Sequence, residues 1–271
     1  MEKVIHTVLN VGLEKPVKIL HITDVHIAKT NEKDTEDHVK LETRRVDIFR
    51  KEGEFPPYTP SEYFEEAIRM AEEIGALLVC TGDVMDIQTQ GNIEEFHRIA
   101  DGHDMMFTPG GHEHQKRCHI TLDEPDGYWM EARKKLQEAF PEFDMDFSNR
   151  IVNGLNIVCA DNSLDYYNAE TVRRFYEEID RGLPMLVFGH DPMRTGYFDA
   201  TELWTENMKP ITKEDLEKSV AMRHDVMTHP LVVASFTGHS HMELESPSET
   251  GKICYETPGL YRGICRLIEI R

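Results

Sequence analysis

Histidine and aspartate residues recur in five short motifs along this 271-residue chain. Their imidazole and carboxylate groups are the side chains that bind divalent metal ions and transfer protons in hydrolytic enzymes. Four of the five motifs contain glycine, which lets the backbone turn tightly beside a ligand. In chain order the motifs are Thr23-Asp24-Val25-His26, Gly82-Asp83-Val84-Met85-Asp86, Gly110-Gly111-His112-Glu113-His114, Gly189-His190-Asp191 and Gly238-His239-Ser240-His241.

Short apolar runs lead into these motifs, and their length and β-branched content predict buried strands. The runs cover residues 17–23, 76–82, 105–111, 155–161, 184–190 and 231–241. Helical patterns lie between them, at residues 61–74, 128–140, 169–179 and 213–227. This alternation predicts an α/β fold with mostly parallel strands. After His241, short runs broken by Pro247 and Pro258 predict a C-terminal antiparallel hairpin.

The position of the motifs at strand ends predicts a metal site. In an open α/β sheet, ligands bind beyond the carboxyl ends of the strands, so the five motifs are expected to meet at one edge. Alternation along an extended backbone places His239 and His241 on the same side, as adjacent ligands require. Mixed carboxylate and imidazole ligands suit Mn, Fe, Zn, Co or Ni. Because imidazole must be neutral to bind a metal, activity is expected to fall below about pH 6.

The composition limits the classes of partner. Fifty Asp and Glu against thirty Lys and Arg give a formal net charge of -20, and the basic residues are scattered, so nucleic acid is disfavoured. No apolar run reaches the roughly 18 residues that span a bilayer, and the charged N-terminus does not have the pattern of a secretory signal. Five widely spaced cysteines fit a reducing, cytoplasmic setting, with Cys80 and Cys159 as small buried hydrophobic residues.

The order of the five motifs resembles the signature of the calcineurin-like metallophosphoesterase family, D-x-H, G-D-x-x-D, G-N-H-[DE], G-H and G-H-x-H. The resemblance runs from Asp24 to His241. It implies a four-layer α/β/β/α sandwich of two mixed β-sheets flanked by helices, with two divalent metal ions at the strand ends. It also implies hydrolysis of a phosphoester bond by attack of a metal-bridging hydroxide.

The resemblance implies two sets of ligands that share one carboxylate. The ligands of one ion would be Asp24, His26 and His241, those of the other His190 and His239, and the bridging carboxylate Asp83. His112 would lie beside the phosphate and protonate the leaving oxygen. Asp86 would orient His112, as a carboxylate behind a histidine fixes its tautomer.

One position departs from the family pattern, because Gly111 stands where the signature has an asparagine that ligates the second ion and contacts the phosphate. Water could fill the position, or a neighbour such as Glu113, His114 or Asn162 could replace the amide. The second site could instead be weak. Glu113 and His114 are explained equally well as loop residues that face solvent. Gly102-His103-Asp104 does not restore the motif, because it precedes a predicted strand.

Other polar residues near the motifs have structural interpretations. His21 lies inside a predicted strand and is expected to be packed or hydrogen-bonded there. His224 and His229 come late in a helical pattern and are expected at its C-terminal end. Asp191, which precedes Pro192, either makes the loop rigid or contacts the substrate.

The sequence therefore predicts a metal-dependent hydrolase of small-molecule phosphomonoesters or phosphodiesters, nucleotide-like compounds included. The alternative is a scaffold of the same fold that is weakly active or inactive and binds a protein partner. The presence of both His112 and Asp86 favours the enzyme. His114-Gln115 stands where phosphoprotein phosphatases have Ser-Arg, which argues against that branch.

One metallophosphoesterase domain is expected over residues 1–271, with insertions near 27–60 and 191–230. Residues 27–60 and 191–212 are longer than a minimal βα connection and are predicted to be functional lids or disordered loop excursions. Tyr197 or Trp204 could stack on the substrate, or these aromatic residues could pack the insertion onto the domain. The sequence leaves the oligomeric state open.

Overall fold

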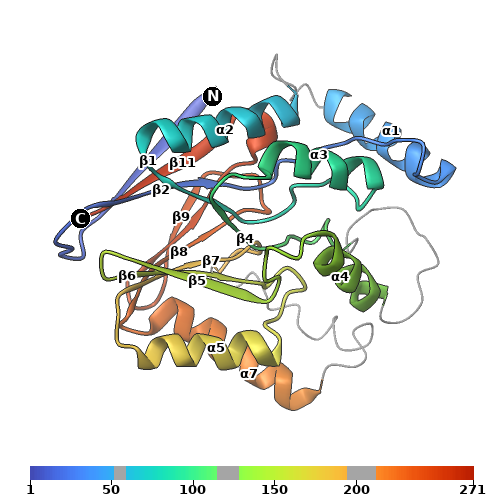
Figure 1. Cartoon of the computed structure of the whole chain (residues 1–271). Helices are drawn as coiled ribbons and strands as arrows, with labels where there is room; N and C mark the ends of the chain where they lie inside the picture. Colours follow the sequence, from blue (N-terminus) through green and yellow to red (C-terminus); the bar gives the residue numbers. More distant parts are fainter. Residues whose placement is uncertain (52–58, 115–127, 194–211) are drawn as a thin grey trace.

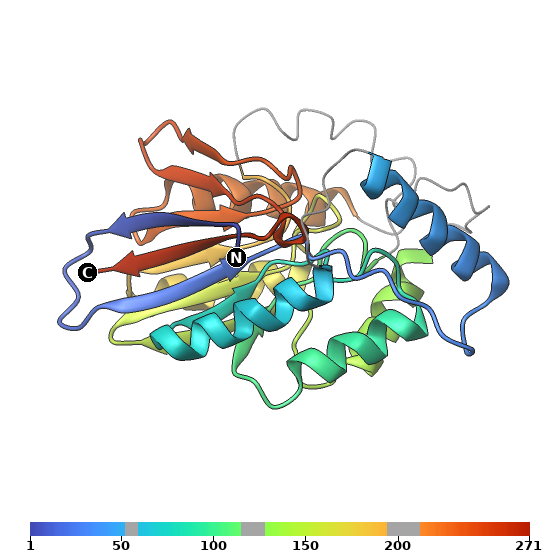
Figure 2. The same cartoon turned by 90° about the horizontal axis from the view of Figure 1, so that it is seen from above.

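The structure, a computed structural model, describes residues 1–51, 59–114, 128–193 and 212–271. Two β-sheets are packed face to face, and helices cover the outer face of each sheet (Figures 1 and 2). The arrangement is the four-layer α/β/β/α sandwich of two mixed sheets that the family resemblance implies. None of the described helices is both long and apolar enough to cross a membrane.

The first sheet has five strands in the order β1-β11-β2-β3-β4. Their bounds are β1 Lys3–Leu9, β11 Ile264–Ile270, β2 Val17–Ile22, β3 Leu77–Cys80 and β4 Met105–Phe107. β2, β3 and β4 run parallel, and β11 is antiparallel to β2 and parallel to β1. Because β2, β3 and β4 end at the same edge, the three motifs that follow them are brought together there.

The second sheet has six strands in the order β5-β6-β7-β8-β10-β9. Their bounds are β5 Phe147–Val152, β6 Leu155–Ala160, β7 Met185–Phe188, β8 Val232–Thr237, β10 Ile253–Glu256 and β9 Leu244–Pro247. β6, β7, β8 and β10 are parallel, with an antiparallel strand at each edge. β9 and β10 form the predicted C-terminal hairpin, and the chain then crosses to the first sheet as β11.

The helices fall into two groups. α2 (Pro60–Ile74) and α3 (Gln90–Ala100) cover the first sheet, and α1 (Glu36–Lys51) lies beside α3 (Figures 1 and 2). α5 (Ala169–Asp180) and α7 (Lys213–Thr228) cover the second sheet, and α4 (Tyr128–Ala139) lies at the side of the sandwich (Figure 1). α2 begins with a capping box between Thr59 and Glu62, which satisfies two backbone donors of its first turn.

Strand alternation divides the core into three layers. On β2, Ile19 points between the two sheets, while Leu20 joins the cluster under α2 and α3. On β7, Phe188 points between the sheets, while Val187 joins the cluster that faces α5 and α7. Each central strand is therefore buried on both faces, which explains why its sequence is a continuous apolar run. This packing fixes the strand ends that carry the motifs.

All six predicted strands and all four predicted helices are present. The sequence did not predict β1, β5, α1 or α3. The interpretation of residues 27–60 as a loop excursion is wrong for α1, which occupies much of that segment. α1 has few apolar residues, and Leu41 and Glu42 are its buried side chains among those described, so it has no apolar stripe to reveal it. Tyr197 and Trp204 lie outside the described residues.

The cysteine predictions are confirmed where they can be compared. Cys80 and Cys159 are buried at the ends of β3 and β6, and both are free thiols. Cys254 and Cys265 are also buried and free. Burial raises the pKa of the Cys159 thiol to about 12, so it remains protonated and unreactive.

Candidate metal centre

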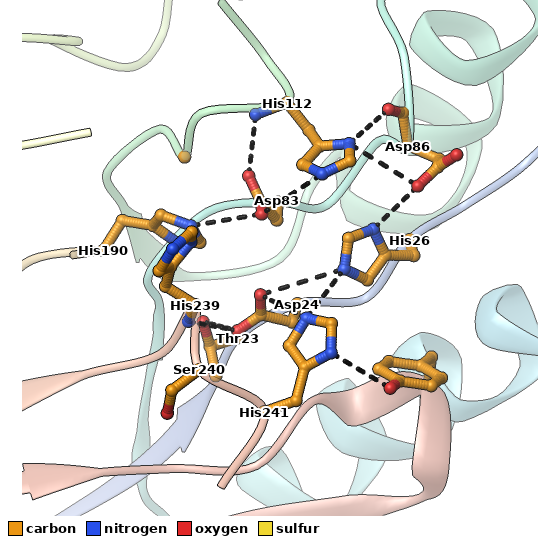
Figure 3. Close-up of polar contacts among 12 residues, drawn as sticks. Thr23, Asp24, His26, Asp83, Asp86, His112, His190, His239, Ser240 and His241 are labelled. Atoms are coloured by element: carbon orange, nitrogen blue, oxygen red, sulfur yellow. Dashed lines mark hydrogen bonds and ion pairs between the residues drawn. The ribbon is translucent and has the colours of Figure 1, made fainter. Parts of the chain in front are cut away.

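The structure brings the histidines and aspartates of all five motifs to one edge of the two sheets (Figure 3). The loops after β2, β3 and β4 supply side chains from the first sheet, and the loops after β7 and β8 supply side chains from the second. The residues that meet are Asp24, His26, Asp83, Asp86, His112, His190, His239 and His241. The prediction that the five motifs meet at one edge of the sheets is therefore confirmed.

The backbone at this edge is strained. Left-handed backbone is unfavourable for side chains other than glycine and is typical of functional sites. Seven non-glycine residues of the described chain have positive φ, and five of them are motif residues. These five are Asp24 (50°), His26 (54°), Asp83 (49°), His239 (65°) and His241 (54°). The fold holds the motif side chains in conformations that local preference alone would not choose.

Close approach of the two sheets also fixes one motif glycine. A Cβ atom on Gly238 would lie 1.9 Å from Thr23 Oγ1 and 2.4 Å from Asp24 Oδ2. The absence of a side chain therefore lets the loop after β8 reach the loop after β2. In this position the His239 backbone N–H donates to Asp24 Oδ2 over 2.9 Å. Thr23 Oγ1 donates to the same oxygen over 2.7 Å.

One group of possible ligands consists of Asp24, His26 and His241. Its ligand atoms all lie within 4.8 Å of one another. His241 Nε2 is 3.0 Å from Asp24 Oδ1 and 3.2 Å from His26 Nε2. The other ring nitrogen of His241 forms a 3.0 Å hydrogen bond with the Tyr261 hydroxyl. Tyr261 was not identified from the sequence, because it lies 20 residues beyond the last motif.

A second group consists of Asp83, His190 and His239, again with ligand atoms within 4.8 Å of one another. His190 Nε2 is 3.1 Å from Asp83 Oδ2. His190 Nδ1 lies 2.7 Å from the Thr81 carbonyl oxygen and donates to it, which directs Nε2 toward Asp83. Asp83 Oδ1 accepts a 2.9 Å hydrogen bond from the His112 backbone N–H. Asp83 therefore faces both the second group and the loop that carries His112.

Asp86 joins His26 of the first group, and His112, to an arginine outside the five motifs. Its Oδ1 is 3.0 Å from His26 Nδ1, and its backbone oxygen is 2.5 Å from His112 Nδ1. The predicted contact of the Asp86 carboxylate with His112 is longer, 3.5 Å. Arg45 of α1 donates to both carboxylate oxygens, through Nε over 2.6 Å and Nη2 over 2.9 Å. Sequence reasoning missed Arg45, because it lies 41 residues from its partner.

The charges at this edge are strongly coupled. Burial disfavours a charged His190, but Asp83 and Asp24 beside it raise its pKa to about 10. Burial likewise opposes charge on His241, but Asp24 raises its pKa. Burial lowers the pKa of His26, which keeps that imidazole neutral and able to bind a metal. Buried carboxylates at this edge thus require neighbouring positive charge, which imidazolium groups or divalent cations can supply.

Glu113 has a different role from either prediction made for it. It is fully buried, so it does not face solvent. Its carboxylate accepts hydrogen bonds from the backbone N–H groups of Asp83, Met85 and Gly110, over 2.8, 2.9 and 2.7 Å. Burial raises its pKa to about 7. Glu113 fastens the loop after β3 to the loop after β4, and its oxygens are engaged in that contact.

The other residues considered from the sequence are also placed. His21 is fully buried, and its ring nitrogens lie 2.9 Å from the Thr257 and Thr81 hydroxyls, which confirms a structural role. His229 caps the C-terminal end of α7 as predicted, whereas His224 lies inside that helix. Asp191 is buried, with Oδ1 3.7 Å from His239 Nδ1.

Two candidate replacements for the missing asparagine already have buried partners. Asn162 Oδ1 accepts from the backbone N–H groups of His190 and Asp191, over 2.8 and 3.0 Å, and its Nδ2 donates to the Asp191 carbonyl. His114 is buried, with Nε2 3.6 Å from Asp161 Oδ2. Neither side chain lies in the second group of possible ligands.

Comparisons with known proteins add to this geometry. The model of the family described as calcineurin-like phosphoesterase matches residues 17–243. No curated protein matches the sequence. Among solved structures, a dimetal phosphatase from Danio rerio is similar over 91% of this chain and 88% of its own, with 10% identity and a TM-score of 0.53.

Two further solved structures are similar at lower scores. One is a 5'-nucleotidase from Candida albicans, with 13% identity and a TM-score of 0.42 over 90% of this chain and 45% of its own. The other is a phosphopantetheinyl hydrolase from Mycobacterium tuberculosis, with 12% identity and a TM-score of 0.41 over 90% of each chain. Of the three scores, the one above 0.5 supports the fold.

Proposed function

The chain belongs to the calcineurin-like phosphoesterase family and is a metallophosphoesterase, and from this premise we propose that it hydrolyses small-molecule phosphomonoesters or phosphodiesters with two divalent ions. The observation that carries the proposal is the meeting of two groups of three ligand residues at the strand ends. In the proposed assignment Asp24, His26 and His241 would hold one ion, His190 and His239 would hold the other, and Asp83 would be a ligand of both.

The donor set supports binding of cations at this position. Asp24 and Asp83 are buried and lie against imidazoles, and Asp83 raises the pKa of His190 to about 10. Without ions, protons on His190 and His241, whose pKa values are raised, would neutralise the carboxylates. Divalent ions would supply the same positive charge and release the protons, because imidazole binds a metal in its neutral form. Manganese, iron, zinc, cobalt and nickel all suit such ligands.

His112 is the proposed proton donor. Its Nδ1 donates to the Asp86 carbonyl over 2.5 Å, so the remaining proton of a charged ring is on Nε2. Nε2 lies 3.9 Å from Asp83 Oδ2 and can give that proton to the leaving oxygen of an ester held there. Divalent ions held at this position would supply Lewis acidity toward the phosphoryl group and would lower the pKa of a nucleophilic water.

Gly111 is the basis for proposing unequal affinity at the two sites. It offers no side-chain ligand, and the contacts of Glu113 and Asn162 keep those two side chains in other hydrogen bonds. We therefore favour water at the vacant ligand position over a substitute side chain. The ion held by His190 and His239 is expected to bind more weakly than the ion held by Asp24, His26 and His241.

The proposals for substrate class, domain organisation and location are supported by properties of the whole chain. A net charge of -20 opposes binding of polyanions and favours a small phosphoester over nucleic acid. The pairing of β1 with β11 joins the two ends of the chain in one sheet, which supports a single domain over residues 1–271. Four free cysteines, at positions 80, 159, 254 and 265, support a reducing, cytoplasmic setting.

The test is hydrolysis of p-nitrophenyl phosphate and bis-p-nitrophenyl phosphate while Mn²⁺ is titrated into metal-free protein. We expect a rate that rises with Mn²⁺, and a loss of about 10²- to 10⁴-fold in kcat for His112→Ala. His103→Ala is the matched control, because His103 lies on the surface in contact with Glu72. Metal binding without hydrolysis of either ester would favour the non-catalytic scaffold.

A further inference from the structure

The segment that leads from the Asp24–His26 loop into α1 is fastened to α3. Asp34 accepts hydrogen bonds from the backbone N–H groups of Gln90 and Gly91, over 2.6 and 3.1 Å, at the N-terminus of that helix. The Lys29 backbone N–H donates to Asn92 Oδ1 over 2.6 Å. A Cβ atom on Gly91 would lie 2.6 Å from the Thr30 Cα, so the two backbones are in close contact.

This docking places two polar side chains of α1 beside the candidate metal centre. Glu42 is buried and accepts a hydrogen bond from Asn92 Nδ2, one helical turn before Arg45. Arg45 is mostly buried, with 12% of its side chain exposed. Its two-point contact with Asp86 matches the fork of the guanidinium group to the planar carboxylate. The contact fixes the carboxylate in both position and orientation.

Asp86 in turn holds an imidazole of the first ligand group. Asp86 Oδ1, which accepts from Arg45 Nη2, is the oxygen that lies 3.0 Å from His26 Nδ1. Because His26 Nδ1 donates a hydrogen bond to the Asp86 carboxylate, the opposite ring nitrogen, Nε2, faces Asp24 and His241 (Figure 3). A carboxylate behind a metal-binding histidine sets the ring orientation, and its loss typically weakens metal affinity 10- to 100-fold.

We propose that Arg45 is a positioning residue, which orients His26 through Asp86 and thereby sets the affinity of the first ion. The inference rests on the proposed function in one respect, the assignment of His26 as a ligand. It adds a role for α1, a helix that contains none of the five motifs. In this proposal the packing of residues 29–45 against α3 holds Arg45 in position and so supports the metal centre.

A direct contact of Arg45 with the substrate phosphate is the competing explanation. The Nε and Nη2 groups of Arg45 already donate hydrogen bonds to Asp86, which argues against a contact of these groups with the phosphate. The two explanations differ in what they change. Loss of a phosphate contact raises KM and leaves metal affinity intact, whereas loss of positioning weakens the first ion and lowers activity at limiting metal.

The experiment is calorimetric titration of Mn²⁺ into metal-free full-length protein. We expect Arg45→Met to weaken the tighter site roughly 10- to 100-fold and to leave the weaker site within about threefold. Arg45→Lys keeps the charge but loses the two-point contact, and an intermediate affinity is expected. Arg44→Met is the matched control, because Arg44 is an exposed neighbour on the same helix and should leave both sites unchanged.

A double substitution decides whether Arg45 acts through Asp86. In an Asp86→Asn background, Arg45→Met is expected to add less than a twofold loss, because the partner is already gone. Should Arg45→Met not fold, Gly91→Ala separates the segment from α3 without altering the centre, and a weaker tight site is expected there too.

Equal Mn²⁺ affinity in wild type and Arg45→Met would overturn the positioning role, as would additive losses in the double variant. A wild-type chain that binds no Mn²⁺ would instead refute the proposed function itself. The two failures are therefore distinguishable in one series of titrations.

Discussion

At the scale of single residues, the candidate metal centre pairs buried carboxylates with positive charge, and either protons on the imidazoles or divalent ions can supply that charge. Asp24 and Asp83 are buried, and the imidazoles beside them balance their charge. The pKa of His190 is raised to about 10 by Asp83 and Asp24, against the effect of burial, so the free chain carries a proton there at neutral pH. A divalent ion that uses His190 as a ligand must displace that proton.

Proton release on metal binding is the first prediction. Titration of Mn²⁺ at pH 7 in buffers of different ionisation enthalpy is expected to show release of about one proton or more per chain. Raising the pH toward 10 should reduce the number released, because His190 then loses its proton before the ion arrives. Heats that do not depend on the buffer would contradict the assignment of His190.

Tyr261 provides a second prediction at this scale. Its hydroxyl forms a 3.0 Å hydrogen bond with His241 Nδ1, behind the proposed ligand atom. Tyr261→Phe is expected to weaken the tighter Mn²⁺ site about tenfold, as measured by calorimetry. Tyr176→Phe is a matched control, because the Tyr176 hydroxyl donates to Asp225, away from the strand-end motifs. Unchanged affinity in Tyr261→Phe would remove Tyr261 from the metal centre.

The sequence predicts the candidate ligands better than the residues behind them. Each ligand follows an apolar strand within a short motif, so local pattern is enough to place it. Arg45 lies on α1 and Tyr261 on the short 3-10 helix Leu260–Arg262, neither of which has such a motif, and their contacts depend on how these segments pack. Glu113 was open to several interpretations because its burial under three backbone donors is a tertiary property.

At the scale of elements, the helices and strands with a strong apolar pattern could be predicted from the sequence, and those with a weak pattern could not. The buried strands β2, β3, β6, β7 and β8 are apolar on both faces, so the sequence gives each a clear signal. β5 and β1 lie at sheet edges, and α1 buries one apolar side chain, Leu41, among its described residues and makes its other contacts through Glu42 and Arg45. Such elements are stabilised by partners that are distant in sequence, and a local pattern carries no information about those partners.

α1 carries a testable buried acid. Burial raises the pKa of Glu42 to about 9 from an ordinary value of 4.5, and its Oε2 atom has no hydrogen-bond partner among the described residues. Between these two pH values the folded chain holds a proton that the unfolded chain has lost. The free energy of unfolding is therefore expected to fall as the pH rises from about 4.5 toward 9.

Glu42→Gln should remove this dependence, because glutamine stays neutral in both states. At pH 8 the variant is expected to be more stable than wild type by about 1 to 3 kcal/mol, and at pH 5 nearly equal to it. Urea denaturation at the two pH values measures the difference. Glu36→Gln serves as a control on the exposed first turn of the same helix. A destabilising effect at pH 8 would show that Glu42 is ionised in the folded protein.

At the scale of the whole molecule, the site lies where the two sheets meet. Loops from the first sheet supply Asp24, His26 and Asp83, while loops from the second supply His190, His239 and His241. The resemblance to a known family implied the four layers, and composition alone would not have done so. The crossing of β11 into the first sheet was not predicted, because β11 pairs with β1 and β2, and both strands are more than 240 residues away in the sequence.

Binding of ions across the two sheets should stabilise the whole fold. At a Mn²⁺ concentration of about 100 times the dissociation constant, the free energy of unfolding is expected to rise by about 2.7 kcal/mol per site. For a chain of this size that corresponds to roughly 5 to 10 °C in Tm, which scanning calorimetry can follow and EDTA should reverse. Any ion that binds only the folded chain raises Tm, so ion binding with no change in Tm would mean that the unfolded chain binds the ions equally well, and would contradict a site assembled by the fold.

The central claim is that one carboxylate, Asp83, belongs to both ion sites. The most direct measurement is the number of Mn²⁺ ions bound per chain at equilibrium, in wild type and in Asp83→Asn. We predict two ions in wild type, the second weaker, and loss of measurable binding at both sites in Asp83→Asn. A variant that still binds two ions, or that loses one while the other is unaffected, would contradict the shared ligand and with it the proposed centre.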